Sequence, residues 1–268
     1  MGTGGDGRAG FTFRRRETAV RGNMENSFVR KLEFAAALDA GDRARLLDLT
    51  SNSTVVEAHE DVVRDGTTQP TAFVVLEGLA CTHRILADGS RQIFAFLLPG
   101  DSCDIHRVPR SWRDTSVTTF VRSRIARVSA EAADRLMTER PNVARALWET
   151  MLVEQSTMRE RLVSLGRRPA DRRLAHLFCE LLYRMRVIGL VEETGRGASF
   201  DFAATQPQIA DAMGLTAVHV NRTLQQLRDA ELVSFRTRRV VVLDEQRLSA
   251  FAGFDARYLH VNATVPQD

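Results

Sequence analysis

The chain has 268 residues, 44% of them apolar, and a formal charge of +3, which are ordinary values for a globular protein with room for two modest domains. Lys31 is the only lysine, and every other basic side chain is an arginine. Cys81, Cys103 and Cys179 form no CxxC pair, so no disulfide framework or structural metal site is indicated and a reducing cytoplasm is expected. No apolar run has the length of a membrane span or the character of a signal peptide, and no membrane partner is expected.

Residues 1–23 are predicted to be a flexible basic arm, or translation from a start upstream of Met24, because glycines and three consecutive arginines dominate them. The stretch from Gly2 to Gly7 matches the G-x-G-x-x-G pattern. No strand precedes it and no apolar helix follows, so a dinucleotide site is not expected. Apolar residues at helical spacing begin near Ser27, where we expect the folded structure to start.

Residues 24–140 are predicted to form a β-roll. Short apolar runs alternate with glycine turns here, which is typical of an antiparallel roll or barrel. Strands are expected at Val62-Val63, Phe73 to Leu76, Ile93 to Leu98 and Ile125 to Val128. Asp88-Gly89 gives the clearest hairpin signal, and its sequence predicts a type I′ turn.

Residues 141–168 are predicted to form one long dimerisation helix that begins after Pro141. Its apolar positions alternate spacings of four and three, the pattern of a coiled-coil seam. The seam comprises Ala144, Trp148, Met151, Gln155, Met158, Leu162 and Leu165. A narrow stripe with one polar member, Gln155, favours a homodimer; packing of this stripe on the chain's own roll is the alternative.

Residues 169–255 are predicted to form a winged helix-turn-helix domain, followed by a tail at 256–268. A helix is expected from Ala170 to Ile188, and then a glycine-rich loop. Thr205-Gln206-Pro207-Gln208 has the form of a capping box that starts a short helix. Gly214 supplies a left-handed stop, and Thr216 caps a second helix that runs to about Ala230. Two helices joined by so tight a turn make a helix-turn-helix.

The second of these helices turns arginine and amide side chains outward. These side chains make two-point contacts with guanine and adenine edges in the major groove of double-stranded DNA. Two strands within residues 233–243 then surround a basic tip, which resembles a wing able to reach phosphates. The predicted DNA contacts are Thr205, Gln206, Thr216, Ala217, Val218, His219, Asn221, Arg222, Gln225, Arg236, Arg238 and Arg239.

This order of parts resembles the CRP/FNR family of bacterial transcription regulators, over roughly Ser27 to Phe254. The most specific stretches are Val75 to Gly78, Phe96 to Asp101 and Thr205 to Glu231. The resemblance implies an α+β fold: a cupin-like antiparallel roll of the cyclic-nucleotide-binding type, a dimerisation helix and a winged helix-turn-helix. It also implies a cytoplasmic homodimer that is not an enzyme, reads a two-fold symmetric operator, contacts RNA polymerase and senses a signal through its roll.

The recognition helix departs from the family pattern. Many members begin it with arginine and glutamate and place another arginine four residues later, whereas this chain has Ala217, Val218 and Arg222. Only the last contact carries over. Without the glutamate there is no acceptor for cytosine N4, so we expect a half-site other than TGTGA, with a thymine methyl against Val218.

The sensory end departs further. Family members that bind cyclic nucleotides carry a glycine-glutamate pair and then arginine with serine or threonine, but here the glutamate is missing and Asp114 follows Arg113. Cyclic nucleotide binding is therefore not expected, and the effector stays unknown. Candidate effector contacts are Arg113, Ser156 and Thr157. The cysteine cluster of the oxygen-sensing branch is also absent, because no cysteine precedes Cys81.

Three other interpretations stay open. His83 and His106 could hold haem or a metal if the fold brought them together, and Cys103 could report redox state. The roll is also the scaffold of cupin-like metal- or ligand-binding proteins and enzymes. Against an enzyme or a metal site, no His/Glu set has the clustered spacing of a metal centre and no Ser/His/Asp arrangement is evident.

Overall fold

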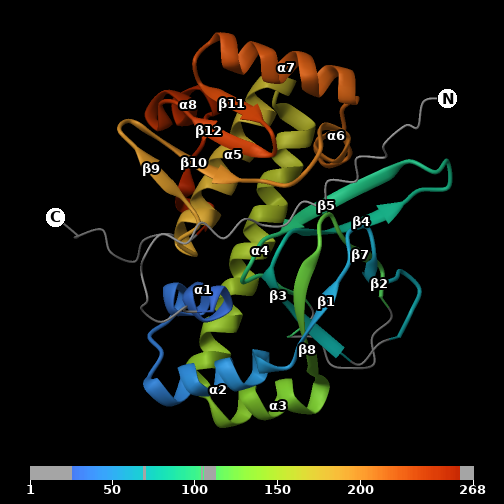
Figure 1. The fold of residues 1–268 in the computed structure, drawn as a ribbon, viewed down its shortest axis with the longest axis vertical. Coiled ribbons are helices and arrows are strands. Elements are labelled where there is room, and N and C mark those ends of the chain that lie inside the picture. Colours follow the sequence, from blue (N-terminus) through green and yellow to red (C-terminus); the bar gives the residue numbers. More distant parts are fainter. Residues whose placement is uncertain (1–25, 69–70, 104, 106–112, 260–268) are drawn as a thin grey trace, which may run out of the picture.

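The computed structural model describes residues 26–68, 71–103, 105 and 113–259. Figure 1 shows a lower part made of a β-roll with helices beside it, a long helix α4 that runs upward from it, and an upper part that carries the helix-turn-helix. This arrangement confirms the predicted fold class. The predicted arm at 1–23, His106 and the end of the predicted tail lie outside the described residues.

Three helices flank the roll, and the sequence analysis anticipated only the first. They are α1 (Ser27–Ala35), α2 (Ala40–Ser51) and α3 (Ala130–Glu139). Helix α1 begins after Asn26, whose side chain accepts a hydrogen bond from the Phe28 amide at 2.9 Å. Asp39 and Asp42 cap α2 reciprocally, but of its apolar residues only Leu46 is fully buried. With so little apolar periodicity, α2 gave no helical pattern to detect.

The roll consists of two four-stranded antiparallel sheets, in the orders β1-β8-β3-β6 and β2-β7-β4-β5. Its strands are β1 (Ser53–Val56), β2 (Asp61–Val63), β3 (Thr71–Glu77), β4 (Ala80–Ile85), β5 (Arg91–Leu97), β6 (Ser102–Cys103), β7 (Ser116–Thr119) and β8 (Ser123–Ser129). In β3, Phe73 and Val75 face the interior of the roll, while Ala72 and Val74 pack against the flanking helices. Burial on both faces explains why this strand is a continuous apolar run.

The hairpin between β4 and β5 is where the sequence placed it, but its turn type is different. Leu86 O accepts a hydrogen bond from the Gly89 amide at 2.9 Å, and the Leu86 amide donates to Ser90 O at 2.8 Å. Gly89 has φ of 83°, whereas Asp88 does not have positive φ. This is the geometry of a type I turn followed by a glycine bulge, so the predicted type I′ turn was wrong.

Gly78, between β3 and β4, is required by its surroundings. Its φ is 97°, and an added Cβ would lie 2.2 Å from Ser123 Oγ and 2.8 Å from Ser123 Cα. We expect Gly78→Ala to lower the free energy of unfolding by roughly 1–3 kcal/mol in urea titrations. Gly166→Ala is the control, because a Cβ there meets nothing within 4 Å and alanine favours a helix. Equal urea midpoints for Gly78→Ala and the wild type would contradict this account.

Helices α4 (Pro141–Arg167) and α5 (Ala170–Val187) lie where they were predicted. Pro141 occupies the first turn of α4, where no hydrogen-bonding amide is needed. One apolar core includes residues of the roll, of α5 and of the C-terminal part. Within it the rings of Phe96 and Phe202 meet edge to face with centroids 5.0 Å apart. The C-terminal part is therefore packed directly on the roll.

The C-terminal part contains β9 (Glu192–Thr194), β10 (Gly197–Asp201), α6 (Gln206–Met213), α7 (Ala217–Asp229), β11 (Val233–Arg236), β12 (Arg239–Val242), α8 (Glu245–Ala252) and the 3-10 helix η1 (Ala256–Leu259). The predicted glycine-rich loop was wrong, because β9 and β10 form a hairpin that completes the sheet β11-β12-β10-β9. Gly197 is needed within a strand, since a Cβ there would lie 2.0 Å from Val242 O.

The predicted tail at 256–268 also begins with a structured segment, η1. None of the described helices is long and apolar enough to cross a membrane.

Candidate nucleic-acid interface and interior cavity

The two helices α6 and α7 begin and end by the devices that the sequence predicted. Thr205 and Gln208 form a reciprocal capping box, with the Thr205 amide donating to Gln208 Oε1 at 2.7 Å. Gly214 ends α6 with a left-handed φ of 61°. Thr216 Oγ1 then accepts from the His219 amide at 3.2 Å and starts α7. These contacts fix a helix-turn-helix.

Helix α7 has one buried and one exposed face. Val220, Thr223, Leu224 and Leu227 are buried, while Val218, Asn221, Arg222, Gln225 and Gln226 are exposed. Val218 is 80% exposed, which is unusual for a large apolar residue on a helix this well packed on its other side. Of the other predicted contacts, Thr216 is exposed and Thr205, Gln206, Ala217 and His219 are half-buried. The predicted contacts therefore gather on and beside one open face.

Two contacts determine what this face offers. Asn221 Nδ2 donates to Gln206 Oε1 at 3.1 Å, which ties the start of α6 to α7, while Asn221 itself is exposed. Within the described chain Arg222 takes part in no ion pair, so its guanidinium is not neutralised by a neighbour. An uncompensated arginine on an open helix face can reach a base edge or a phosphate.

The tip of the wing is a two-residue turn between β11 and β12. Thr237 and Arg238 have φ of 51° and 60°, the combination of a type I′ turn, although neither is glycine. Arg236 is exposed and Arg238 half-buried. Arg239 does not project with them, because it pairs with Asp201 at 2.9 Å and donates to Ser199 Oγ at 2.7 Å. Arg236 is thus exposed at the tip, whereas Arg239 is held by the neighbouring strands.

Much of the predicted seam of α4 is exposed in the single chain. Trp148, Met158 and Leu162 are 58%, 42% and 65% exposed. Gln155 is also exposed, while Ala144, Met151 and Leu165 are half-buried. The face of α4 that packs inside the chain carries other residues, among them Val143 and Leu147. Trp148 and Leu162 therefore do not pack on the chain's own roll, whereas Met158 lines the cavity that the roll borders, and dimerisation through the seam stays a prediction.

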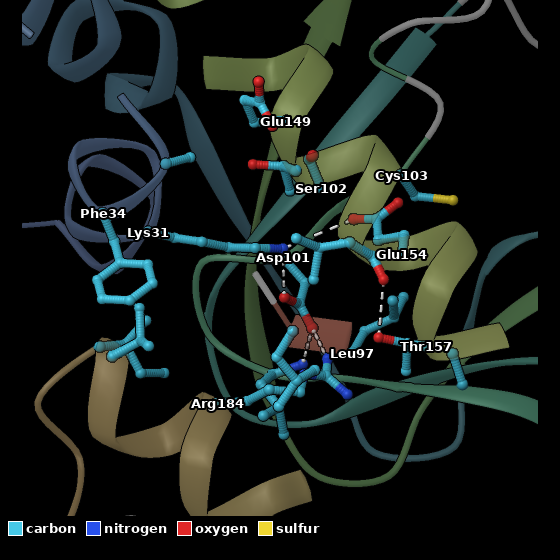
Figure 2. A pocket seen from close by; sticks show the side chains of 18 of the residues that line it. Lys31, Phe34, Leu97, Asp101, Ser102, Cys103, Glu149, Glu154, Thr157 and Arg184 are labelled. Atoms are coloured by element: carbon cyan, nitrogen blue, oxygen red, sulfur yellow. Dashed lines mark hydrogen bonds and ion pairs between the residues drawn. The ribbon is translucent and has the colours of Figure 1, made fainter. Parts of the chain in front are cut away.

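A cavity of about 1370 Å³ lies between α1, the roll, α4 and α5 (Figure 2). At its base Asp101 Oδ1 accepts from Lys31 Nζ at 2.8 Å, and Oδ2 accepts from Arg184 at 2.6 Å and from the Leu98 amide at 2.7 Å. Burial alone would raise the pKa of Asp101, but Lys31 and Arg184 together lower it below its ordinary value.

A second buried pair extends this network. Arg161 donates to Phe94 O at 2.7 Å and to Glu180 Oε1 at 3.2 Å, and Arg184 reaches the same oxygen at 3.2 Å. The ionic chain from Lys31 to Glu180 thus connects α1, the roll, α4 and α5. Because these charges are mostly buried, removing one member weakens the compensation of each charge that it pairs with.

The cavity receives only one of the three predicted effector contacts. Thr157 lines it, with Oγ1 donating to Val153 O at 2.8 Å. Ser156 is buried and accepts from Arg159 at 2.7 Å, and Arg113 donates to Thr71 O at 2.8 Å outside the cavity lining. The sequence analysis missed the contribution of α1, which supplies Lys31 and Phe34. A short helix far from the roll strands in sequence carries no signal that it lines the same cavity.

His83 and the three cysteines do not lie in a cluster of metal ligands among the described residues. His83 is buried, its Nε2 is 2.8 Å from Thr118 Oγ1, and burial lowers its pKa. No group of three or more potential metal ligands occurs among the residues that the structure describes. Burial raises the pKa of the Cys81 and Cys179 thiols to about 12, while Cys103 is half-buried beside the cavity.

Two family models match the two parts of the chain: a cyclic nucleotide-binding domain at residues 53–140 and a Crp-like helix-turn-helix domain at residues 172–251. The nitrogen fixation regulation protein FixK of Bradyrhizobium diazoefficiens is 28% identical, over 88% of this chain and 91% of that protein. The transcriptional activator protein FnrL of Cereibacter sphaeroides is 29% identical, over 75% of this chain and 80% of that protein.

The solved structures agree at the level of the fold. FixK2 from Bradyrhizobium japonicum superposes with a TM-score of 0.66 at 24% identity, covering 76% of this chain and 98% of that chain. The fold of this chain, from the roll to the helix-turn-helix, is thus similar to that of FixK2 over nearly the whole of that chain. The chain belongs to the CRP/FNR family of DNA-binding transcription regulators.

Proposed function

We propose that the protein acts as a homodimer whose two α7 helices enter successive major grooves of a two-fold symmetric operator, about one helical turn apart. The seam of α4 joins the two copies, and the wing contacts phosphates through Arg236 and Arg238. The protein works in the cytoplasm, contacts RNA polymerase when bound, and is a binding protein and not an enzyme. Its roll responds to a signal other than a cyclic nucleotide.

One observation carries this proposal: the exposed face of α7 combines Arg222, Asn221 and Gln225 with an apolar contact point at Val218. Solvated helix faces ordinarily carry oppositely charged pairs, whereas this face carries an unpaired arginine and amides. Val218 occupies the place of a family glutamate, which supports a half-site with a thymine opposite this position.

The contacts inside the roll support the proposal that the signal is not a cyclic nucleotide. Arg113, the residue that the sequence offers as the family's phosphate-binding arginine, donates to the backbone of β3 and does not line the cavity. Asp101, at the base of the cavity, already pairs with both Lys31 and Arg184. The remaining cavity wall is formed partly by the exposed ring of Phe34.

The reading of bases is tested with Arg222→Ala on the operator that the wild-type protein selects from random duplex DNA. We expect the affinity for that operator to fall by about 1–3 kcal/mol per half-site, with relaxed selectivity at one guanine, measured by competition binding at fixed salt. Arg124→Ala on the roll is the matched control, because Arg124 is also an exposed arginine and, among the residues that the structure describes, forms an ion pair with Glu77 alone. Unchanged selectivity for Arg222→Ala, or selection of TGTGA half-sites, would contradict the proposal.

The wing is tested through the dependence of binding on salt. We expect log K to fall linearly with log salt for the wild-type protein, with a slope of several ions, because lysine and arginine contacts displace counterions from phosphates. Arg236→Ala should reduce that slope by about one per wing and weaken binding to all sequences alike. A salt slope equal to that of the wild type would exclude Arg236 from phosphate binding.

A further inference from the structure

An ion pair joins the roll to the first helix of the helix-turn-helix. Arg91 on β5 places Nη2 2.7 Å and Nε 2.8 Å from Oδ2 of Asp211 on α6. Both side chains are 30% exposed, so the pair lies at the edge of the domain boundary and not in the core. It connects two positions that are 120 residues apart in the sequence.

Apolar contacts and a second arginine hold the same helix. Ile93 and Phe96 of β5 belong to the same core as Ile209 and Met213 of α6. Arg173 on α5 donates to Met213 O at the end of α6 and to Leu165 O at the end of α4, the latter at 3.1 Å. Helix α6 is thus held on the roll along one side and on the α4–α5 junction at its end.

Helix α7 follows α6 as one unit. The turn between them is closed by the Leu215 amide, which donates to Ala210 O at 3.1 Å, and by the bond from Asn221 to Gln206. Figure 1 shows β5 beneath α6, with α7 at the top of the molecule, away from the roll. A shift of α6 on the roll therefore moves the exposed face of α7, while the roll leaves that face open.

We propose that Arg91 and Asp211 are positioning residues that set the separation and orientation of the two recognition helices, and so determine which half-site spacing the dimer accepts. This inference rests on the proposed dimeric function. In a two-fold dimer joined through α4, the placement of each α7 is fixed by how its helix-turn-helix sits on the roll. Since a half-site is read by one α7 alone, loss of the ion pair leaves the reading of a half-site intact and loosens only the spacing.

The experiment measures binding of the full chain to operators in which the spacing between half-sites is varied one base pair at a time, and to a single half-site. For Arg91→Ala and Asp211→Ala we expect the preference for the best spacing over its neighbours to fall by roughly fivefold, since a dimer has two copies of a weak, partly exposed pair. Half-site affinity should stay within about twofold of the wild type. The charge-swapped double variant, Arg91→Asp with Asp211→Arg, should regain most of the spacing preference.

Arg124→Ala, which breaks an ion pair within the roll, is the control and should keep the wild-type preference. An unchanged spacing preference in both single variants would overturn the inference, and so would a loss of half-site affinity equal to the loss on the full operator. Failure of the wild type to select any half-site would instead refute the proposed function, so the two failures are distinguishable.

Discussion

Leu162→Asp is expected to make the protein monomeric and to lower its affinity for a two-fold symmetric operator by about 10²- to 10⁴-fold. Leu162 is 65% exposed in the single chain and lies in line with Met158 and Trp148 on α4. A carboxylate at the centre of a helix–helix seam would be buried without a partner in the dimer. Without dimerisation the second half-site no longer binds as part of the same molecule, so the gain from effective concentration is lost.

The oligomeric state is measured by sedimentation and the affinity by titration of the operator and of one half-site. Leu47→Asp on α2 is the matched control, because Leu47 is 47% exposed and lies off the seam. We expect the control to behave as the wild type in both measurements. A Leu162→Asp protein that stayed dimeric, or a monomer that kept full operator affinity, would refute the role given to the seam.

Helices with a clear capping residue at the start or a glycine stop at the end could be predicted from the local sequence. Thr205, Gly214 and Thr216 specify where α6 and α7 begin and end, because a side-chain cap or a left-handed residue acts within a few positions of the chain. The β9–β10 hairpin was missed for the opposite reason. β9 is short and polar, β10 has only five residues, and the need for Gly197 comes from the approach of β12, which lies far along the sequence.

The exposed face of α7 could be predicted from the sequence, and the cavity could not. A helical period alone separates the outward residues of α7 from Val220, Leu224 and Leu227, so the reading face could be predicted from spacing. The cavity could not, because α1, the roll, α4 and α5 meet only in the folded chain. Arg239 shows the limit at the wing: its position at a basic tip predicted a phosphate contact, but spacing alone could not reveal that the folded chain pairs it with Glu192 and Asp201 of neighbouring strands.

The sensory part shows how a family pattern can persist while its chemistry changes. The Pro99-Gly100-Asp101 turn is retained, and Gly100 has φ of 89° with the backbone of Ser27 close against it. Asp101 in that turn binds Lys31 of α1 and Arg184 of α5, so here the turn serves as a junction between the roll and the DNA-binding part. The same junction forms the base of the cavity, which places any bound molecule next to the contacts that join the two parts.

Asp101→Asn is accordingly expected to destabilise the protein by about 3–5 kcal/mol at pH 7, because Lys31 and Arg184, both largely buried, lose their nearest carboxylate. Lys31 then keeps only Glu154 at 3.6 Å, and Arg184 keeps only Glu180 at 3.2 Å, among the described residues. The folded pKa of Asp101 lies below its ordinary value of about 3.9, so its stabilisation is complete above that pH and is lost as the pH falls through the folded pKa. In urea titrations between about pH 2 and pH 7, the free energy of unfolding of the wild type should therefore exceed that of the variant, and this difference should become smaller only in acid. Asp48→Asn is the control, since Asp48 is 68% exposed and its one ion pair within the described part of the chain is with Arg45. This substitution should change stability by less than about 1 kcal/mol. If Asp101→Asn unfolded at the wild-type urea concentration at pH 7, Asp101 would not be the junction between the roll and the DNA-binding part.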